Sequence, residues 1–181
     1  YDLQPVKDKS VLVTGGTTGI GRAIAYLLAA RGARVLVFGR HEQELDEALE
    51  DFRRTGAEVY GLTADVSKLD NVRNVFQQAD EKLGSLDILV NNAAVEGGKF
   101  EGESSENIEY VVRTNVAGYL VCAHEAVTRM KRRGGGHIVN VGSMSANLRE
   151  SETSTYVATK AAIQGFSESL RKTVNPDGIK V

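Results

Sequence analysis

The chain has 181 residues, of which 41% are hydrophobic and 25% are charged, as in a single globular domain long enough to bury a core. Its formal net charge of -2 argues against a protein that binds nucleic acid or an anionic membrane surface. No apolar run approaches the roughly 20 residues that cross a bilayer, and residues 1–9 lack the apolar core of a signal peptide, so we expect a cytoplasmic protein.

Short apolar runs alternate with longer amphipathic runs along the chain. The first, Ser10–Thr14, is rich in β-branched residues and ends at glycines, which predicts a buried strand. The next run, Gly19–Arg31, carries Ile24, Leu27 and Leu28 on one helical face and stops at a glycine, which predicts a helix. Further strands are predicted at 33–38, 58–62, 86–90 and 137–141. Further helices are predicted at 42–55, 67–83, 115–133 and 156–174, and a polar loop at 96–107 leads into a helical segment near Ile108.

This alternation of strands and helices indicates the fold class. Near-continuous apolar strands joined by helices predict a parallel sheet covered on both faces. We therefore expect an α/β fold with a Rossmann-like, doubly wound parallel sheet, formed as one domain over residues 1–181. Ligands of such sheets bind at the carboxyl ends of the strands, near the switch in strand order. The residues that follow predicted strand ends should converge there: Gly15, Arg40, Asp65, Asn91 and Ser143.

The last residues of the chain open a further strand. The chain begins without Met and stops at Val181, just after a predicted strand starts at Ile179. Strands usually need about five residues. We therefore expect the native polypeptide to continue beyond Val181, so that the sheet described by this sequence is truncated at its C-terminal end. The segment that follows is expected to form a lid over the substrate.

A glycine-rich turn follows the first predicted strand. In Gly15-x-x-x-Gly19-x-Gly21, the glycines let the backbone turn tightly and approach a pyrophosphate at the N-terminus of the next helix. Such a turn by itself also fits a plain connection between a strand and a helix. Its position directly after a strand favours a dinucleotide site.

Tyr156 and Lys160 are four residues apart, so on a helix they lie on one face, one turn from each other. A free phenol is a poor acid or base at neutral pH, but a neighbouring ammonium favours its phenolate form. The pair therefore predicts Tyr156 as a proton donor and acceptor. Without the rest of the sequence, the same pair would fit an ordinary helical surface.

Six short segments occur in a characteristic order: Thr14-Gly-Gly-Thr-Thr-Gly-Ile-Gly21, Ala64-Asp65-Val66, Asn91-Asn92-Ala93-Ala94, Asn115 with Gly118, Ile138-Val-Asn-Val-Gly-Ser143, and Tyr156 with Lys160. From the first strand to the last residue, this pattern resembles the short-chain dehydrogenase/reductase family. The resemblance implies that a serine polarises the substrate oxygen, a tyrosine moves the proton, a lysine holds the nicotinamide ribose, and an asparagine positions a water relay. These roles fall on Ser143, Tyr156, Lys160 and Asn115. Ser143 precedes Tyr156 by thirteen residues, as the family pattern expects, which favours it over Ser145.

The resemblance also implies the residues that contact a dinucleotide. Asp65 would contact the adenine and Val66 would lie against its ring. The other implied contacts are Gly15, Thr17, Thr18, Gly19, Ile20, Gly21, Arg40 and Asn91, together with Tyr156 and Lys160. Other readings stay open from the residues alone: Asp65 or Asn115 could cap a helix, and Asn91 and Asn92 could tie strand edges together.

The end of the second predicted strand bears on cofactor choice. An acidic residue there would bind the ribose 2′-hydroxyl of NAD, whereas an arginine suits the 2′-phosphate of NADP. The sequence reads Phe38-Gly39-Arg40, which favours NADP(H), with His41 as a further basic neighbour. Thr18 stands where many NADP-preferring relatives carry a second basic residue, and Arg40 could also be a solvated surface charge.

We therefore predict an NADP(H)-dependent oxidoreductase that interconverts a carbonyl and an alcohol. One alternative is an NAD-dependent alcohol dehydrogenase, and another is a catalytically silent nucleotide-binding protein. The expected partner is a small carbonyl or alcohol substrate, whose identity the sequence does not reveal. The loops at 95–105 and 147–155 should line a polar mouth. The resemblance implies a homodimer or homotetramer that pairs through the helices at 115–133 and 156–174.

Neither a metal site nor a disulfide is predicted. Cys122 is the only cysteine, so no internal disulfide is possible. His41, His124 and His137 are scattered and have no cysteine partners at zinc spacing. We assign none of these residues a role in the chemistry.

Overall fold

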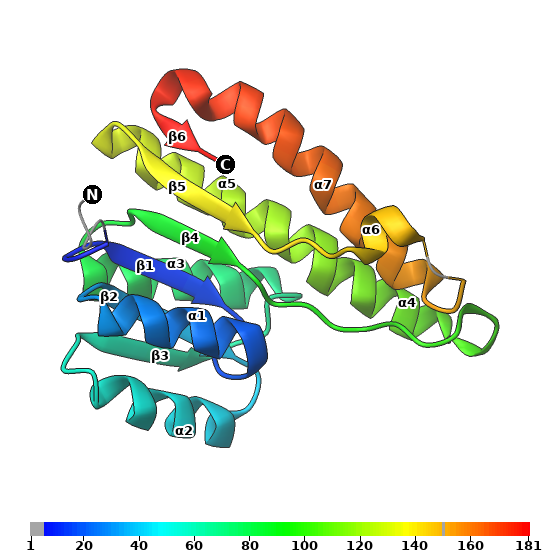
Figure 1. Cartoon of the computed structure of the whole chain (residues 1–181), viewed down its shortest axis with the longest axis horizontal. Helices are drawn as coiled ribbons and strands as arrows, with labels where there is room; N and C mark the ends of the chain where they lie inside the picture. The colour runs from blue at the N-terminus through cyan, green and yellow to red at the C-terminus, as the bar shows by residue number, and fades with distance from the viewer. Residues whose placement is uncertain (1–5, 150) are drawn as a thin grey trace.

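The computed structural model describes residues 6–149 and 151–181. Residues 1–5, part of the segment in which no signal peptide is expected, lie outside the described part. Six strands form one sheet in the order β3-β2-β1-β4-β5-β6, and every neighbouring pair is parallel (Figure 1). The strands are β1 (Ser10–Thr14), β2 (Arg34–Gly39), β3 (Val59–Thr63), β4 (Ile88–Asn91), β5 (Gly136–Asn140) and β6 (Ile179–Lys180). The predicted fold class, a Rossmann-like doubly wound α/β sheet, is confirmed.

Helices cover the two faces of this sheet unequally. One face packs against α1 (Gly19–Ala30) and α2 (Glu42–Arg53), and the other packs against α3 (Leu69–Leu83), α5 (Gly118–Arg133) and α7 (Ser154–Val174). This division follows from the strand order. Connections between parallel strands are right-handed, so a helix that leads to a strand on one side of β1 covers one face, and a helix that leads to a strand on the other side covers the opposite face. The remaining helices are α4 (Ser105–Val112) and α6 (Ser145–Leu148).

The central strand β1 explains why the apolar runs are nearly continuous. All five of its residues are buried. Val11 and Val13 belong to the core beneath α1 and α2, whereas Leu12, which points to the opposite face, belongs to the core beneath α3 and α5. A strand covered on both faces needs apolar side chains at successive positions, and not only at alternate ones.

The apolar face predicted for helix α1 is wrong at one residue, Leu27. Leu27 was expected in the core, but its side chain is 51% exposed. The buried residues of α1 are Gly21, Ala25 and Ala29, with Ile24 and Leu28 packed at the edge of the core. Small residues let the helix approach the sheet closely, which turns the bulkier Leu27 outward.

The helical segment expected near Ile108 is present as α4, and α5 begins at Gly118, three residues after the start expected at Asn115. Ser104 caps α4, because its hydroxyl oxygen accepts a hydrogen bond from the backbone N–H of Asn107 at 3.1 Å. A π-helical turn, Arg113–Ala117, then joins α4 to α5. Asn115 therefore lies inside a continuous helical segment and does not cap its start. Single π-helical turns of this kind occur frequently at functional sites.

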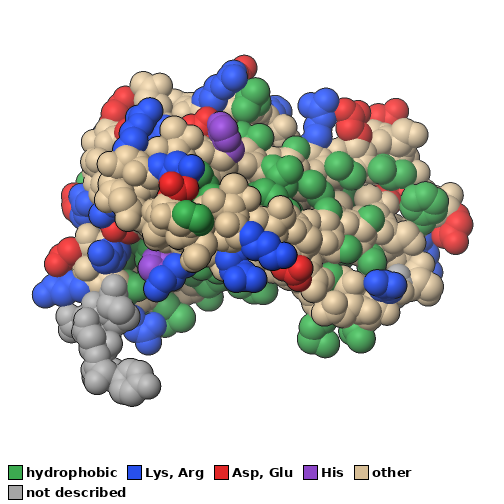
Figure 2. Space-filling view, turned by 90° about the horizontal axis from the view of Figure 1, so that it is seen from above, with side chains coloured by type: hydrophobic (Ala, Val, Ile, Leu, Met, Phe, Trp, Pro, Cys, Tyr) green, Lys and Arg blue, Asp and Glu red, His purple; other side chains and the backbone are tan. Residues whose placement is uncertain are grey.

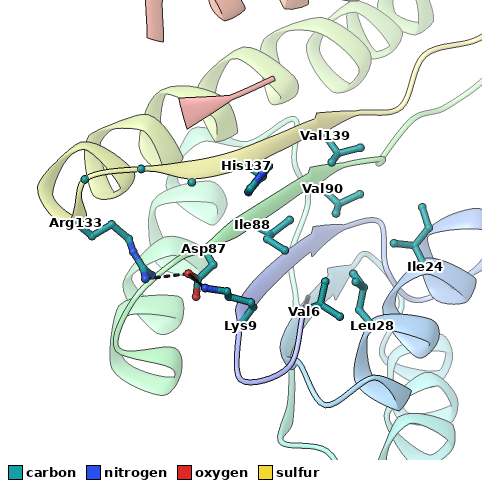
Figure 3. Close-up of a pocket in the computed structure, with 13 residues that line it drawn as sticks. Val6, Lys9, Ile24, Leu28, Asp87, Ile88, Val90, Arg133, His137 and Val139 are labelled. Carbon is teal, nitrogen blue, oxygen red and sulfur yellow. Dashed lines mark ion pairs between the residues drawn. The ribbon is translucent and has the colours of Figure 1, made fainter. Parts of the chain in front are cut away.

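One part of the sheet lacks a helical cover among residues 6–149 and 151–181. On the α1 face of β4 and β5, a cavity of about 600 Å³ is lined by apolar side chains that include Ile88, Val90 and Val139 (Figure 3). Val139 is 47% exposed, although it lies on an interior strand of a parallel sheet. At one end of the cavity, Asp87 pairs with Arg133 at 2.9 Å. This cavity lies away from the residues predicted to carry the chemistry.

Candidate active site

The glycine turn joins the end of β1 to the start of α1. Gly15 has a φ of +61°, a left-handed conformation that favours glycine. A Cβ at Gly21 would lie 2.2 Å from the carbonyl oxygen of Gly15, so the first turn of α1 approaches β1 more closely than any side chain allows. The Nδ2 of Asn92 donates to the carbonyl oxygens of Thr14 and Gly15, each at 3.1 Å. Asn92 therefore ties the turn to the end of β4.

A cavity of about 530 Å³ opens above this turn, at the carboxyl ends of β1 to β4. Its volume is within the range of small-molecule and cofactor sites. It collects the residues predicted to bind a dinucleotide that follow β1, β2 and β3: Gly15, Thr17, Thr18, Gly19, Ile20, Arg40, Asp65 and Val66. It is also lined by Ala93, from the Asn91–Ala94 segment, by Glu96, from the loop predicted to line the mouth, and by Glu44 and Thr114, which were not predicted. The convergence expected at one edge of the sheet is therefore present for these residues.

Asn91 is placed differently from the other predicted cofactor contacts. Its side chain is fully buried, and it does not line this cavity. Its Nδ2 donates to the carbonyl oxygen of Tyr119 at 3.1 Å and to the Oδ1 of Asn140 at 3.0 Å. Asn91 thus links β4 to α5 and β5, which corresponds to the structural reading left open by the sequence.

Arg40 extends from the end of β2 along the rim of this cavity. Its guanidinium donates to the hydroxyl of Tyr110, and its Cζ lies 5.8 Å from the centre of the Tyr110 ring. Among the ion pairs of the described residues, none involves Arg40. The arginine is therefore held in place by an aromatic residue while its charge is left without a carboxylate.

Asp65 and Val66 lie between β3 and α3. The Oδ1 of Asp65 accepts hydrogen bonds from the backbone N–H of Ser67 at 2.9 Å and from its hydroxyl at 2.7 Å. Asp65 therefore stabilises the turn before α3 while it also lines the cavity. Val66 is buried and packs against Gly118, where a Cβ would approach its Cγ2 to 2.8 Å.

Asn115 is fully buried, and its side chain hydrogen-bonds to two distant segments of the chain. Its Oδ1 accepts from the backbone N–H of Val95 at 2.8 Å. Its Nδ2 donates to the carbonyl oxygen of Val95 at 2.8 Å and to the Oγ1 of Thr159 at 3.2 Å. Asn115 thereby connects the loop after β4 with α7, one residue before Lys160.

Lys160 is 2% exposed and belongs to α7. Its Nζ donates to the carbonyl oxygen of Val141 at 2.9 Å and to the hydroxyl oxygen of Tyr119 at 3.5 Å. The same nitrogen lies 5.7 Å from the centre of the Tyr156 ring. Burial lowers the pKa of Lys160 below its ordinary value. The predicted pairing of a cation with a phenol on one face of the helix is present.

Ser143 follows the end of β5. Its hydroxyl oxygen accepts from the backbone N–H of Ser145 at 3.2 Å, and the two hydroxyls lie 3.1 Å apart. Ser143 and Lys160 line one cavity of about 280 Å³ between β5, α6 and α7. The structure thus brings Ser143 to Lys160, and Lys160 to Tyr156.

Apolar side chains surround this end of the molecule. Phe100, Met144 and Leu148 are 54%, 74% and 61% exposed. α4 and α6 lie in the right half of the molecule in Figure 1. Seen from above in Figure 2, that half shows more hydrophobic side chains than the left half. None of these three side chains lines the two cavities that hold the predicted site residues, and the linings of those cavities include Glu96, Asn147 and Glu168, so the polar mouth stays a prediction. Residue 150, within the predicted loop at 147–155, lies outside the described residues.

Two residues of this region were not predicted from the sequence. Tyr119 contacts Lys160, and its spacing of four residues from Asn115 could have placed it on the same helical face. Glu103 accepts from the hydroxyl of Thr155 at 2.6 Å and from the Nδ2 of Asn107 at 2.7 Å. It ties the loop before α4 to the start of α7, and no local pattern indicated that contact.

Within residues 6–149 and 151–181, no group of three or more His, Cys, Asp or Glu side chains is arranged to hold a metal ion. In the same part of the chain, no helix is both long and apolar enough to span a membrane.

Comparison with known proteins identifies the matching family. The family described as short chain dehydrogenase matches residues 9–181. A 3alpha-hydroxysteroid dehydrogenase of Mediterraneibacter gnavus is 32% identical over 179 residues, which cover 97% of this chain and 72% of that protein.

Two solved structures superpose closely. A short chain dehydrogenase from Burkholderia cenocepacia in complex with NADP has a TM-score of 0.91 at 33% identity, covering 97% of this chain and 72% of that one. An NAD+-bound xylitol dehydrogenase has a TM-score of 0.94 at 26% identity, covering 98% and 69%. Both cofactors therefore occur among proteins of this shape.

Proposed function

The chain belongs to the short-chain dehydrogenase family, and from that premise we propose that it is an NADP(H)-dependent oxidoreductase that interconverts a carbonyl and an alcohol. The observation that carries this proposal is the buried ammonium of Lys160 beside the ring of Tyr156. An ammonium in this place stabilises a phenolate, and a tyrosine that can exist in both forms can donate and accept the substrate proton.

The described residues fit a dinucleotide. Gly15 and Gly21 let the turn pack closely, since a Cβ there would approach the Cα of Ala93 or the Gly15 carbonyl oxygen to 2.8 or 2.2 Å. A Cβ at Gly19 would meet nothing within 4 Å, so the backbone at this position borders the open cavity. Backbone N–H groups at the start of α1 suit a pyrophosphate. Asp65 and Val66 would hold the adenine, and Lys160 would hold the ribose next to the nicotinamide. When bound, the nicotinamide supplies or accepts the hydride.

The protein's side chains would then handle the substrate oxygen and its proton. In the direction of reduction, the hydroxyl of Ser143 donates a hydrogen bond to the carbonyl oxygen of the substrate. The phenol of Tyr156 transfers its proton to that oxygen as the carbon gains the hydride. The phenolate left on Tyr156 is stabilised by the ammonium of Lys160 and regains a proton before the next cycle. Asn115 fixes the helix turn beside them through Val95 and Thr159.

Arg40 supports the choice of NADP(H) over NAD(H). Within residues 6–149 and 151–181 its charge pairs with no carboxylate, and it lies on the cavity rim at the end of β2, where a 2′-phosphate would bind. Use of NAD(H) remains the second candidate, because Glu44 and Glu96 line the same cavity and could bind ribose hydroxyls. Oxidation of NADPH and NADH, measured in parallel against a panel of aldehydes and ketones, tests both. Binding of either cofactor without turnover of any substrate would favour the silent nucleotide-binding protein.

We also propose an apolar part in the substrate and a homo-oligomeric assembly. Met144 and Leu148, which follow Ser143 closely in the chain, have exposed side chains that suit hydrocarbon better than a fully polar ligand. The outer face of α7 exposes small residues, Ala158, Ala161 and Gly165 among them, which allow close packing of a second helix. Analytical sedimentation would measure the number of chains in the assembly. Activity against aldehydes of increasing chain length would measure the preference for an apolar substrate.

A further inference from the structure

Tyr119 is a second phenol in contact with the predicted catalytic lysine. It lies near the start of α5 and is 1% exposed. Its hydroxyl donates to the carbonyl oxygen of Val141 at 3.3 Å and accepts from the Nζ of Lys160 at 3.5 Å. The centre of its ring is 5.4 Å from the same nitrogen. Tyr119 therefore offers Lys160 both an oxygen and an aromatic face.

The surroundings of Lys160 make this contact important. A buried ammonium requires hydrogen-bond acceptors or a compensating charge. No carboxylate within residues 6–149 and 151–181 forms an ion pair with Lys160. The carbonyl of Val141 and the two phenols, Tyr119 and Tyr156, are the groups that stabilise it. Removing one of these three groups should therefore move the ammonium of Lys160 or make its charged form less stable.

Tyr119 is itself held from two sides. Its backbone carbonyl accepts a hydrogen bond from the Nδ2 of Asn91, which also bonds Asn140. Its hydroxyl donates to Val141, which is the carbonyl that also accepts from Lys160. The ring is therefore fixed between β4 and the end of β5, and the position of Lys160 depends on a phenol that has little freedom to move.

Tyr119 does not serve as an acid or base. Burial, and in smaller part the neighbouring Tyr156, raises the pKa of Tyr119 well above its ordinary value, so its phenol stays protonated. Its hydrogen-bond acceptor, a backbone carbonyl, cannot pass a proton on. Its contribution is a fixed dipole and a ring face.

We propose that Tyr119 is a positioning residue, which holds the ammonium of Lys160 against the carbonyl of Val141 and close to the ring of Tyr156. The proposal rests on the function proposed above for Tyr156 and Lys160. It assigns to Tyr119 the task of keeping the charge where it favours the phenolate of Tyr156. Loss of the hydroxyl alone should loosen the ammonium, and loss of the ring should loosen it further.

The experiment uses Tyr119→Phe, which removes the hydroxyl, and Tyr119→Leu, which also removes the ring. Cys122→Ala is the matched control, because Cys122 is equally buried on the same helix and is not among the hydrogen-bond or aromatic partners of Lys160 in the described part of the chain. The first measurement is an ultraviolet titration of tyrosine ionisation, in which the difference between each protein and its Tyr156→Phe counterpart isolates Tyr156. This measurement requires no turnover. The titratable groups facing Lys160 are Tyr119 from α5 and Tyr156 from α7, with Glu168 of α7 lining the same cavity.

In Tyr119→Phe, the midpoint of Tyr156 ionisation should move upward by about one pH unit, the shift expected from weakening one hydrogen bond to a charged group. In Tyr119→Leu it should move further, and in Cys122→Ala it should not move. The rising limb of kcat/KM for alcohol oxidation should shift in the same direction, with a decrease of about tenfold at neutral pH for Tyr119→Phe. In a Lys160→Met background, Tyr119→Phe should have no further effect on the midpoint, since it acts through Lys160.

An unchanged midpoint in Tyr119→Phe and Tyr119→Leu would overturn the proposal, as would an equal shift in Cys122→Ala or a full shift that persists without Lys160. The proposed function fails separately, if the wild-type protein turns over no carbonyl or alcohol substrate. In that case the titration still decides whether Tyr119 positions Lys160.

Discussion

The Nζ of Lys160 lies 5.7 Å from the centre of the Tyr156 ring, with the two residues on adjacent turns of α7. The lysine is almost fully buried, whereas the tyrosine is partly exposed. A partly exposed phenol is therefore paired with a cation that is shielded from solvent. This relationship leads to the first two of four predictions.

Tyr156→Phe should leave NADPH binding nearly unchanged and lower kcat by about 10²- to 10⁴-fold, the loss expected when an acid/base group is removed. The ring remains, so the packing around Lys160 is kept. Steady-state kinetics and a fluorescence titration with NADPH measure the two effects. The exposed Tyr26→Phe serves as a control of the same chemistry elsewhere on the surface. A variant that retains more than about a tenth of the wild-type kcat would remove Tyr156 from the mechanism.

Lys160→Met should lower kcat and weaken cofactor binding while it raises the melting temperature at neutral pH. Because burial lowers the pKa of Lys160 in the folded state, the unfolded chain binds the proton more tightly. At pH values below the pKa of Lys160 in the folded state, the buried charge therefore lowers the free energy of unfolding. This loss disappears as the pH rises from that pKa towards the ordinary pKa of lysine, because the folded protein then releases the proton.

The stability difference between Lys160→Met and the wild type should therefore shrink towards alkaline pH. At neutral pH we expect the variant to melt at least about 2 °C higher. Thermal unfolding, followed by circular dichroism at several alkaline pH values, measures this difference in melting temperature. Lys172→Met, a change on the exposed end of the same helix, should show no such pH dependence. A Lys160→Met protein that melts lower than the wild type at every pH would contradict this account.

Arg40→Asp should shift cofactor preference from NADP(H) towards NAD(H), because it removes a charge-assisted contact and adds repulsion against a 2′-phosphate. One such contact contributes about 1.5 to 3 kcal/mol, so the ratio of kcat/KM values should change by at least about tenfold. Tyr110→Phe, which removes only the hydroxyl that accepts from Arg40, should change the ratio less. If the wild type already prefers NAD(H), the NAD-dependent alternative becomes the first candidate.

Gly21→Ala should weaken binding of either cofactor by at least about tenfold, because its Cβ would lie 2.2 Å from a backbone carbonyl and force the glycine turn open. Gly165→Ala is the control, since a Cβ there meets nothing within 4 Å and alanine favours a helix. Calorimetric titration with NADPH and NADH measures the affinity of both variants. Wild-type affinity in a folded Gly21→Ala protein would show that the close approach of α1 to β1 does not matter for binding.

The order of strands and helices could be predicted from the sequence because the patterns that specify them are local. Ser10–Thr14 is buried on both faces and reads as an apolar run, and glycines stop the helices that follow. The predicted parallel sheet is confirmed, and the contact between Tyr156 and Lys160 follows from helix geometry over four residues. The side of α1 that faces the core was only partly predicted, since Leu27 is exposed.

Other features depend on contacts between distant segments, which hydrophobic periodicity does not encode. Asn91 follows a strand like the other predicted ligands, yet the packing of α5 turns its side chain to Tyr119 and Asn140. Asn115 bonds the loop after β4 and Thr159 of α7, which only the crossing of those segments allows. Tyr119 is 41 residues from Lys160.

The sequence by itself determined the alternation of elements, the glycine turn and the helical tyrosine-lysine pair, because each depends on neighbours within one or two turns. The tertiary structure alone decided which buried polar groups meet around Lys160. Those contacts form when β4, β5, α5 and α7 pack together, and the burial that this packing produces is what changes the chemistry of the ammonium and the phenols.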